Sequence, residues 1–353
     1  MIDLIKRVSL IILVVLASCQ SRTPTLPVSA NTPVPDRATS IGSPSVTEIP
    51  PLKLQIVTRG DWTLYETPSN LVVYSFAFDP NGSLWIGLTG KVIKWIPNTM
   101  SYIEFNFADN FEGNNLFVDN LADVWTGGMY SNIQQYHDNQ WREHNFGSPM
   151  LLSSDGTIWA SGFNTETGAC VYHYDFSAWT QYCPPTNSDS RIFDLAIGPD
   201  DLLWVSLSTS DKSASKGVWR LNESRWEKVN ELSTSTWPIY YLAKTLDSAI
   251  WAVGSKNLST NENGSVKKFD GKNWSVYENS EYVFGIKASD NLLWARGIDY
   301  LLRFDKDNWQ KIYIDDELNK LFGGPINIQV IGFSPSGTLC VGTTKGVICQ
   351  NSP

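Results

Sequence analysis

One pattern of polar and apolar positions recurs seven times along the chain. In each repeat a polar turn leads into an aliphatic residue and a tryptophan, and small or β-branched residues follow. The seven copies begin at Leu84, Val124, Ile158, Leu203, Ile250, Leu293 and Leu339, and the last has Cys340 in place of the tryptophan. A period of about 40 to 45 residues with strand-forming residues is typical of β-propeller blades. The pattern therefore predicts seven blades.

A second aromatic residue follows a later polar turn in each of the first six repeats. These residues are Tyr102, Trp141, Trp179, Trp226, Trp274 and Trp309. The turns before them are rich in aspartate, asparagine and glycine, which favour tight hairpins. The first tryptophan thus marks the second strand of a four-stranded blade, and the later aromatic residue marks the fourth.

The seventh repeat has no fourth strand of its own. Residues 61–66, which precede the first complete blade, show the same turn, tryptophan and alternating pattern. A closed ring hides strand edges that would otherwise invite aggregation. We therefore predict an all-β fold, a seven-bladed β-propeller of four-stranded antiparallel blades, in which residues 61–66 complete the last blade.

Residues 1–19 have the features of an export signal. Lys6 and Arg7 precede an apolar run at residues 8–17, and a small-residue cleavage site ends at Cys19. The apolar run is too short to span a bilayer, which takes roughly 20 residues. The segment resembles a bacterial lipoprotein signal, which implies that Cys19 carries a lipid. The alternative is an ordinary secretory signal with an incidental cysteine. We expect an exported protein, lipid-anchored to the cell envelope outside the cytoplasm.

Residues 20–52 contain seven prolines, many serines and threonines, and no aromatic residue. Such a segment buries too little apolar surface to offset the entropy of ordering, so we expect a disordered tether. The propeller domain is then residues 53–353. Of the net charge of −9, residues 1–52 contribute +1, so the propeller carries −10. This charge excludes nucleic acid as an expected partner. An envelope protein or a small ligand is expected instead, with the propeller a monomer.

Four cysteines fall into two pairs that flank turns. Cys170 and Cys183 lie on either side of one hairpin, and Cys340 and Cys349 on either side of another. Facing residues of antiparallel strands lie within disulfide range. We predict the disulfides Cys170–Cys183 and Cys340–Cys349. A metal site is disfavoured because the pairs belong to different blades and show no CxxC spacing.

Residues 79–89 read DPNGSLWIGLT, and residues 153–159 and 334–343 are poorer copies of the same phrase. This phrase resembles the repeat of the two-component regulator propellers. In that family the repeats usually form extracytoplasmic sensor domains fused to a membrane helix and a histidine kinase. The sequence shows neither of those parts. The resemblance therefore implies the fold and a binding role rather than signalling.

The repeated tryptophans are interpreted as structural, filling the space between blades rather than stacking on carbohydrate. Acidic residues also recur before them and are interpreted as turn formers rather than calcium ligands. These acids are Asp79, Asp123, Asp155, Asp201, Asp247 and Asp290.

The face that carries the blade-to-blade links and the links between second and third strands is the candidate recognition face. Its links are long in the fourth and fifth repeats and rich in aromatic residues, and function tends to sit on loops of a rigid scaffold. The candidate binding residues, around the channel mouth, are Arg191, Phe193, Trp237, Tyr240, Tyr282 and Phe111. The alternative is that these aromatic rings cap the core.

An enzyme is the competing class of protein. His137, His144 and His173 are expected on third or fourth strands, away from the channel axis. The innermost strands offer Asp119 and Asp194, and the acids at residues 315–317 are interpreted as a solvated loop. These residues do not suggest the mutual geometry of catalysis, so neither enzymatic activity nor a cofactor is expected. The alternatives to a binding or sensor-like domain are a scaffold subunit of an envelope complex and a propeller hydrolase or lyase.

Overall fold

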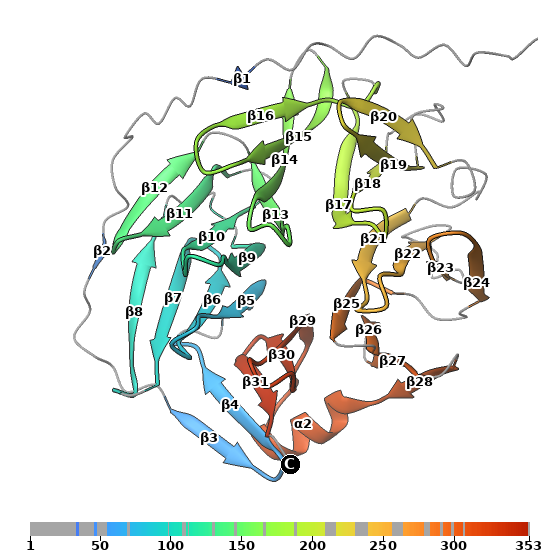
Figure 1. Ribbon diagram of the computed structural model, residues 1–353. Helices are drawn as coiled ribbons and strands as arrows, with labels where there is room; N and C mark the ends of the chain where they lie inside the picture. The colour runs from blue at the N-terminus through green and yellow to red at the C-terminus, as the bar shows by residue number, and fades with distance from the viewer. Residues whose placement is uncertain are drawn as a thin grey trace, which may run out of the picture.

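The computed structural model describes most of the chain beyond residue 54 and two short segments before it. The described residues are 33–34, 46–47, 55–68, 71–97, 99–107, 111, 113–128, 131–144, 147–164, 167–186, 189–208, 217–229, 239–255, 264–278, 283–289, 292–297, 300–305 and 308–351. The proposed signal segment, with Cys19, lies outside them. Seven antiparallel sheets form a ring around a central channel (Figure 1). The predicted seven-bladed propeller is confirmed.

The first three blades follow one another along the chain. Blade one contains β5 (Ser75–Phe78), β6 (Leu84–Leu88), β7 (Lys91–Ile96) and β8 (Ser101–Asn106). Blade two contains β9 (Asn115–Val118), β10 (Val124–Gly127), β11 (Ile133–His137) and β12 (Gln140–His144). Blade three contains β13 (Ser148–Leu152), β14 (Ile158–Asn164), β15 (Gly168–Tyr174) and β16 (Trp179–Tyr182).

The next three blades repeat this order, with the first strand of each blade innermost. Blade four contains β17 (Arg191–Ile197), β18 (Leu203–Ser208), β19 (Gly217–Asn222) and β20 (Arg225–Lys228). Blade five contains β21 (Ile239–Lys244), β22 (Ile250–Ser255), β23 (Gly264–Phe269) and β24 (Trp274–Glu278). Blade six contains β25 (Gly285–Ser289), β26 (Leu292–Arg296), β27 (Leu301–Asp305) and β28 (Asn308–Ile312).

Blade seven joins the two ends of the chain. Its strands β29 (Ile328–Phe333), β30 (Leu339–Thr343) and β31 (Gly346–Gln350) are followed in space by β4 (Trp62–Glu66) and β3 (Ile56–Arg59). Strand β4 pairs with β31 in a register that places Leu64 opposite Ile348. The predicted ring closure is confirmed. Strand β3, a fifth strand on the outer edge of this blade, is an addition to the prediction.

The repeated tryptophans lie in the second strands and pack between blades. Trp85 of β6 stacks on Phe105 of its own blade with ring centroids 5.8 Å apart. It also contacts Tyr136 of blade two at 5.1 Å. The fully buried members of this set are Trp85, Trp125, Trp204 and Trp251. Since buried aromatic rings contribute large apolar areas, these contacts hold neighbouring blades together, as the sequence pattern predicts.

Helix α2 (Ile314–Phe322) lies between blades six and seven, where a solvated loop was expected. Its first turn holds the three acids at residues 315–317, which favour the positive end of a helix. Ile314 and Leu318, four residues apart, are both buried on one face. The three consecutive acids made the apolar spacing of Ile314 and Leu318 hard to recognise in the sequence. The Trp62 indole N–H donates to the Glu317 carboxylate at 3.0 Å, so the helix also fastens the closing strand.

Two short strands come from the segment that was expected to be a disordered tether. Strand β1 (Pro33–Val34) pairs with β16, and β2 (Val46–Thr47) pairs with β8. These four residues of the expected tether are thus extended and paired with blade edges. The outermost strand of a blade has unpaired backbone groups, and an extended segment can pair with them even when it contains proline.

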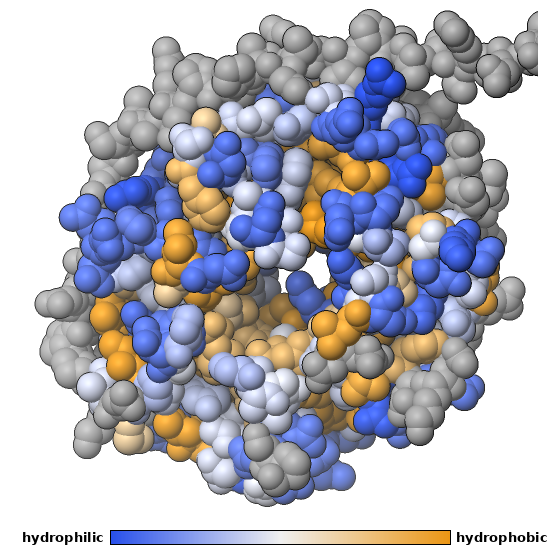
Figure 2. Space-filling model, in the orientation of Figure 1, coloured by the Kyte–Doolittle hydropathy of each residue, from blue (hydrophilic) through white to orange (hydrophobic). Residues whose placement is uncertain are grey.

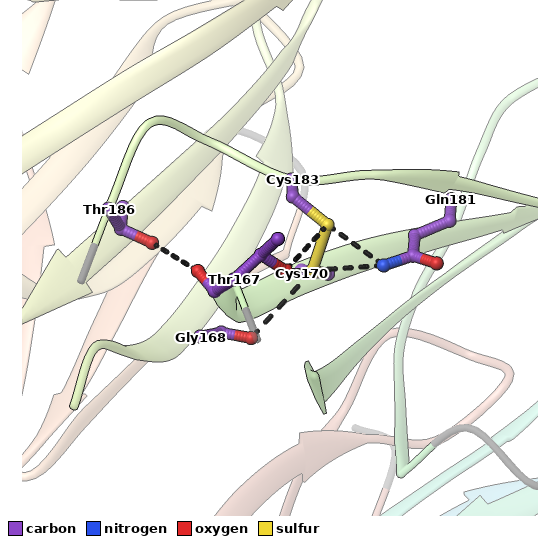
Figure 3. Close-up of a disulfide and its surroundings, with 6 residues drawn as sticks. All are labelled: Thr167, Gly168, Cys170, Gln181, Cys183 and Thr186. Carbon is purple, nitrogen blue, oxygen red and sulfur yellow. Dashed lines mark hydrogen bonds between the residues drawn. A yellow bond between two sulfur atoms is a disulfide. The ribbon is translucent and has the colours of Figure 1, made fainter. Parts of the chain in front are cut away.

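Both predicted disulfides are present. Cys340 and Cys349 face each other across β30 and β31, with Cα atoms 4.0 Å apart. The Cα atoms of Cys170 and Cys183 are 4.2 Å apart, and the side chain of Gln181 lies beside this bond (Figure 3). The antiparallel register alone was enough to predict both pairings.

Candidate functional site

Interruptions in the innermost strands aim side chains at one end of the central channel. The ladder between β17 and β18 shifts between Ile192 and Asp194, which leaves Phe193 as an extra residue. The same shift leaves Tyr240 in β21 and Gln329 in β29. Such β-bulges re-aim the side chain at the bulge. All three lie near the start of an innermost strand, at the end where the chain enters from the preceding blade.

Two further aromatic residues occupy the corresponding place just before β5 and β25. The backbone N–H of Tyr74 donates to the carbonyl oxygen of Gly87 at 3.0 Å, and that of Phe284 donates to the carbonyl oxygen of Arg296 at 2.7 Å. These hydrogen bonds extend the pairing of β5 with β6 and of β25 with β26 by one residue each. We call Tyr74, Phe193, Tyr240, Phe284 and Gln329 the mouth residues. Figure 2 shows the opening at the centre of the ring, with hydrophobic residues on part of its wall.

The aromatic mouth residues remain partly accessible. Tyr74 is 37% exposed, and Phe193, Tyr240 and Phe284 are half-buried. The rings of Phe193 and Tyr240 meet edge to face with centroids 5.0 Å apart. This contact joins blades four and five at the mouth, and leaves ring surface for another molecule to contact.

Two arginines stack on aromatic rings near the mouth residues. The Arg191 guanidinium lies 4.5 Å from the ring centre of Phe163, which is 48% exposed. The Arg296 guanidinium lies 4.8 Å from that of Phe284, and also donates to the carbonyl oxygen of Ile328 at 2.8 Å. Burial lowers the pKa of Arg296. The mouth thus combines flat apolar rings with fixed positive charge.

The structure brings together three of the six residues predicted for binding and separates one. Arg191, Phe193 and Tyr240 all lie at the channel mouth. Phe111 is only 3% exposed and its ring stacks on Phe107 at 4.2 Å, so it belongs to the core. For Phe111 the core-capping alternative is the correct one. Trp237 and Tyr282 lie outside the described residues.

Tyr74, Phe163 and Arg296 were missed by the sequence reasoning. Tyr74 precedes the first strand of blade one, where the link between the second and third strands is very short, whereas long links were the signal for recognition residues. Phe163 and Arg296 lie near the ends of second strands, beyond the repeated residues. Their position at the mouth depends on how neighbouring strands pair. The one signal in the sequence for a mouth residue was an aromatic residue directly before an innermost strand.

The three histidines lie on the third and fourth strands of blades two and three, and each has a partner. His137 Nδ1 lies 2.7 Å from a carboxylate oxygen of Asp123. His144 is buried, and its Nδ1 accepts the indole N–H of Trp179 at 3.2 Å. His173 stacks on Trp159 with ring centroids 4.2 Å apart, and burial lowers its pKa. These contacts give each histidine a packing role.

The acids before the repeated tryptophans form turns. One oxygen of Asp79 accepts the backbone N–H groups of Asn81 and Ser83, both at 2.9 Å, and the other accepts the Trp85 indole at 3.1 Å. The prediction is wrong for Asp123, which instead bonds Gln135 and His137, because Asp119 holds the turn of blade two. It is also wrong for Asp201, because Asp200 accepts the Trp204 indole in blade four. Asp290 lies outside the described residues. No group of three or more His, Cys, Asp or Glu side chains suited to a metal ion occurs in the described part of the chain.

Comparison with known proteins supports the fold and one repeat. A family model described as "Two component regulator propeller" matches residues 67–90, which include β5 and β6. The chain thus contains at least one repeat of this kind, at the phrase from which the resemblance was inferred. None of the curated proteins matches.

Solved propellers of several kinds share the fold. A streptogramin B lyase structure aligns with a TM-score of 0.61 at 16% identity, over 82% of this chain and 96% of that one. The extracellular domain of the putative hybrid two component system BT4673 from B. thetaiotaomicron aligns with a TM-score of 0.61 at 15% identity. That alignment covers 83% of this chain and 40% of the other.

A structure of YCF48 bound to D1 peptide aligns with a TM-score of 0.58 at 14% identity, over 85% of this chain and 100% of that one. At such low identity these likenesses define the fold alone. Among the residues that the structure describes, no helix has the length and apolar composition to cross a bilayer.

Proposed function

We propose that this protein is a membrane-anchored, extracytoplasmic binding or sensor-like propeller that recognises its ligand or partner at the channel mouth. The observation that carries the proposal is the recurrence of aromatic side chains at one position of four innermost strands. These are Tyr74, Phe193, Tyr240 and Phe284.

The position of these rings supports recognition over simple packing. The tryptophans that hold the blades together are buried, whereas the mouth rings retain accessible surface. A closed ring of sheets is a rigid support, and the bulges lie at Phe193 and Tyr240, near the ends of their strands. Large rigid side chains lose little entropy on binding, and aromatic residues and arginine are enriched at recognition surfaces.

The location outside the cytoplasm rests on two features. Two disulfides close hairpins in blades three and seven, and disulfides persist in oxidising compartments. The segment ending at Cys19 has the composition of a lipoprotein signal. We further propose that Cys19 carries the lipid that anchors the protein. Globomycin inhibition of processing, together with mass spectrometry of the N-terminal peptide, tests this anchor.

The recognition face can be tested without knowing the ligand in advance. The full chain would be photo-crosslinked in intact cells through a probe at Tyr74, and the crosslinked species identified. The double variant Phe193→Ala/Tyr240→Ala should lose this species, because it removes the ring pair that joins blades four and five at the mouth. Leu246→Ala is the control, since Leu246 is 71% exposed on a turn at the other end of the channel. Equal crosslinking in both variants would contradict the proposal.

A scaffold subunit is the second candidate, favoured by the fold likeness to peptide-bound YCF48. In that case the crosslinked species is one envelope protein in constant ratio to this chain, and it co-purifies after detergent extraction. A sensor domain would instead yield a ligand whose occupancy varies with its concentration. Turnover of streptogramin B by the purified chain would support the lyase alternative, for which the fold likeness is the observation.

A further inference from the structure

A cavity of about 410 Å³ lies in the central channel, beyond the mouth residues. It is lined by residues 151–154, 194–197, 242–244 and 286–288, from the innermost strands of blades three to six and the turn after β13. The first three segments are the later parts of their strands, so the cavity lies towards the turns that lead to the second strands. It is therefore separate from the proposed recognition site.

The lining has a distinct chemical character. Lys244 and Lys287 contribute two ammonium groups, Asp194 contributes one carboxylate, and Ser153 and Ser154 contribute hydroxyls. The other nine residues are leucine, isoleucine or alanine. The lining therefore combines aliphatic surface with polar and charged groups that can orient a small molecule.

Both oxygens of the Asp194 carboxylate accept hydrogen bonds from backbone N–H groups. One oxygen accepts the backbone N–H of Leu242 from β21 at 2.9 Å, and the other accepts that of Leu195 at 2.9 Å. Burial raises the pKa of Asp194 to about 6, while these N–H groups and the positive charge of Lys287 act to lower it. Asp194 is thus a poor counter-ion for a bound cation.

The ammonium groups of Lys244 and Lys287 are better able to bind a ligand than the Asp194 carboxylate is. Lys244 Nζ lies 3.9 Å from a carboxylate oxygen of Asp201, a residue that is itself exposed, and such exposed pairs contribute little. Lys287 is exposed on β25 and faces the channel near Asp194. An ammonium group pairs readily with a carboxylate that enters from solution.

We propose that this cavity binds a small organic anion with an aliphatic or aromatic body, such as a monocarboxylate. The anionic end pairs with Lys287 and Lys244 and accepts a hydrogen bond from the Ser154 hydroxyl. The apolar body packs on the half-buried side chains of Leu151, Leu152 and Ile197. Recognition at the mouth does not depend on this site, so either proposal can fail alone.

Proton binding by Asp194 adjusts the charge of the cavity. The charged group that acts on Asp194 is Lys287 on β25, while its own strand contributes a backbone N–H. Lys244 on β21 also lines the cavity and pairs with Asp201. With Asp194 ionised, these four side chains carry no net charge, and its protonation raises their net charge to +1. Anion binding should therefore tighten as the pH falls through about 6.

The test uses the full chain and three probes of one shape: hexanoate, hexanamide and hexylamine, titrated calorimetrically at pH 7.5 and 5.5. Hexanoate should bind most tightly, and more tightly at the lower pH. Lys287→Met should weaken hexanoate binding about tenfold, equivalent to about 1.4 kcal/mol. Lys272→Met, on an exposed turn of blade five, is the matched control and should leave binding unchanged.

Asp194→Asn gives a second, independent readout. Without an ionisable group at this position, hexanoate affinity at pH 7.5 should rise to the value of the unmodified chain at pH 5.5, and its pH dependence should disappear. Thermal unfolding of each variant confirms that it is folded. Preference for hexylamine, equal hexanoate affinity in Lys287→Met, or no hexanoate binding at millimolar concentration would each overturn the proposal.

Discussion

The indole N–H of Trp125 donates to the Asp119 carboxylate at 2.8 Å, and the other oxygen of that carboxylate accepts two backbone N–H groups of the turn between them. One buried side chain therefore fixes both the turn into the second strand and the ring that packs between blades. The same relationship links Trp85 to Asp79 in blade one.

Asp119→Ala should be strongly destabilising. It leaves the backbone N–H of Asp123 and the indole N–H of Trp125 buried without a partner, and each costs about 1–3 kcal/mol, so a loss of about 2–6 kcal/mol is expected. Urea unfolding followed by tryptophan fluorescence measures the change. Asp138→Asn is the control in the same blade, because the Asp138 side chain is 85% exposed and asparagine tolerates the left-handed backbone at this position (φ 48°). Similar losses in the two variants would show that the turn does not depend on this carboxylate.

Leu64→Ala tests the closure of the ring. Leu64 is buried in β4, within the apolar cluster that also contains Ile348 and Val341. Truncating a buried leucine costs about 2–5 kcal/mol through lost transfer energy and the cavity that remains. The same substitution at exposed Leu246 should change the free energy of unfolding by less than about 0.5 kcal/mol. If Leu64→Ala were equally neutral, blade seven would not depend on β4.

The disulfides should add modest stability. They join cysteines 13 and 9 residues apart, and closing loops of this size stabilises by about 2–3 kcal/mol in the chain-entropy description. Each double substitution of a pair by alanine should lower the free energy of unfolding by that amount. Peptide mapping without reductant identifies the linkages. A bond between the two pairs would contradict the strand registers of blades three and seven.

Asp194 should make stability depend on pH in a defined direction. Its pKa in the folded chain, about 6, is above the ordinary value of 3.8, so the folded state holds the proton more tightly. Its contribution to stability is therefore complete only below about pH 3.8 and is lost as the pH rises from 3.8 to 6. Ionisation of Asp194 should lower the free energy of unfolding by about 2 kcal/mol between pH 4.5 and pH 7.5, and Asp194→Asn should remove this part of the pH dependence. Urea unfolding at both values measures this, with exposed Asp201→Asn as the control.

Features set by local pattern were predictable from the sequence. The seven tryptophan repeats, the two cysteine hairpins and the match of residues 61–66 to a missing strand each depend on spacing within a few residues of a turn. Helix α2 was missed because three consecutive acids obscure the spacing of Ile314 and Leu318. The strands β1 and β2 could not be predicted, since they depend on pairing with the outer edges of distant blades.

The site was only partly predictable because it depends on register and on long-range packing. Phe193 and Tyr240 lie in links that are visibly aromatic, but only the bulges place them at the mouth. Phe111 has the same kind of sequence context and is buried against Phe107. The cavity depends on how the ends of four separate strands diverge, which no single repeat specifies.

The pairing of β4 with β31 also bears on how the chain matures. Thr63 and Asn351, whose side chains share a hydrogen bond of 2.7 Å, are 288 residues apart in the chain. If export proceeds from the N-terminus, the β3–β4 hairpin crosses the membrane before the other strands of the blades, and the edge of β4 that pairs with β31 stays open until the last strand follows. Contacts this distant in sequence form slowly, and an unpaired strand edge is prone to aggregate. Outside the cytoplasm, this hairpin is therefore the segment most in need of a chaperone during secretion.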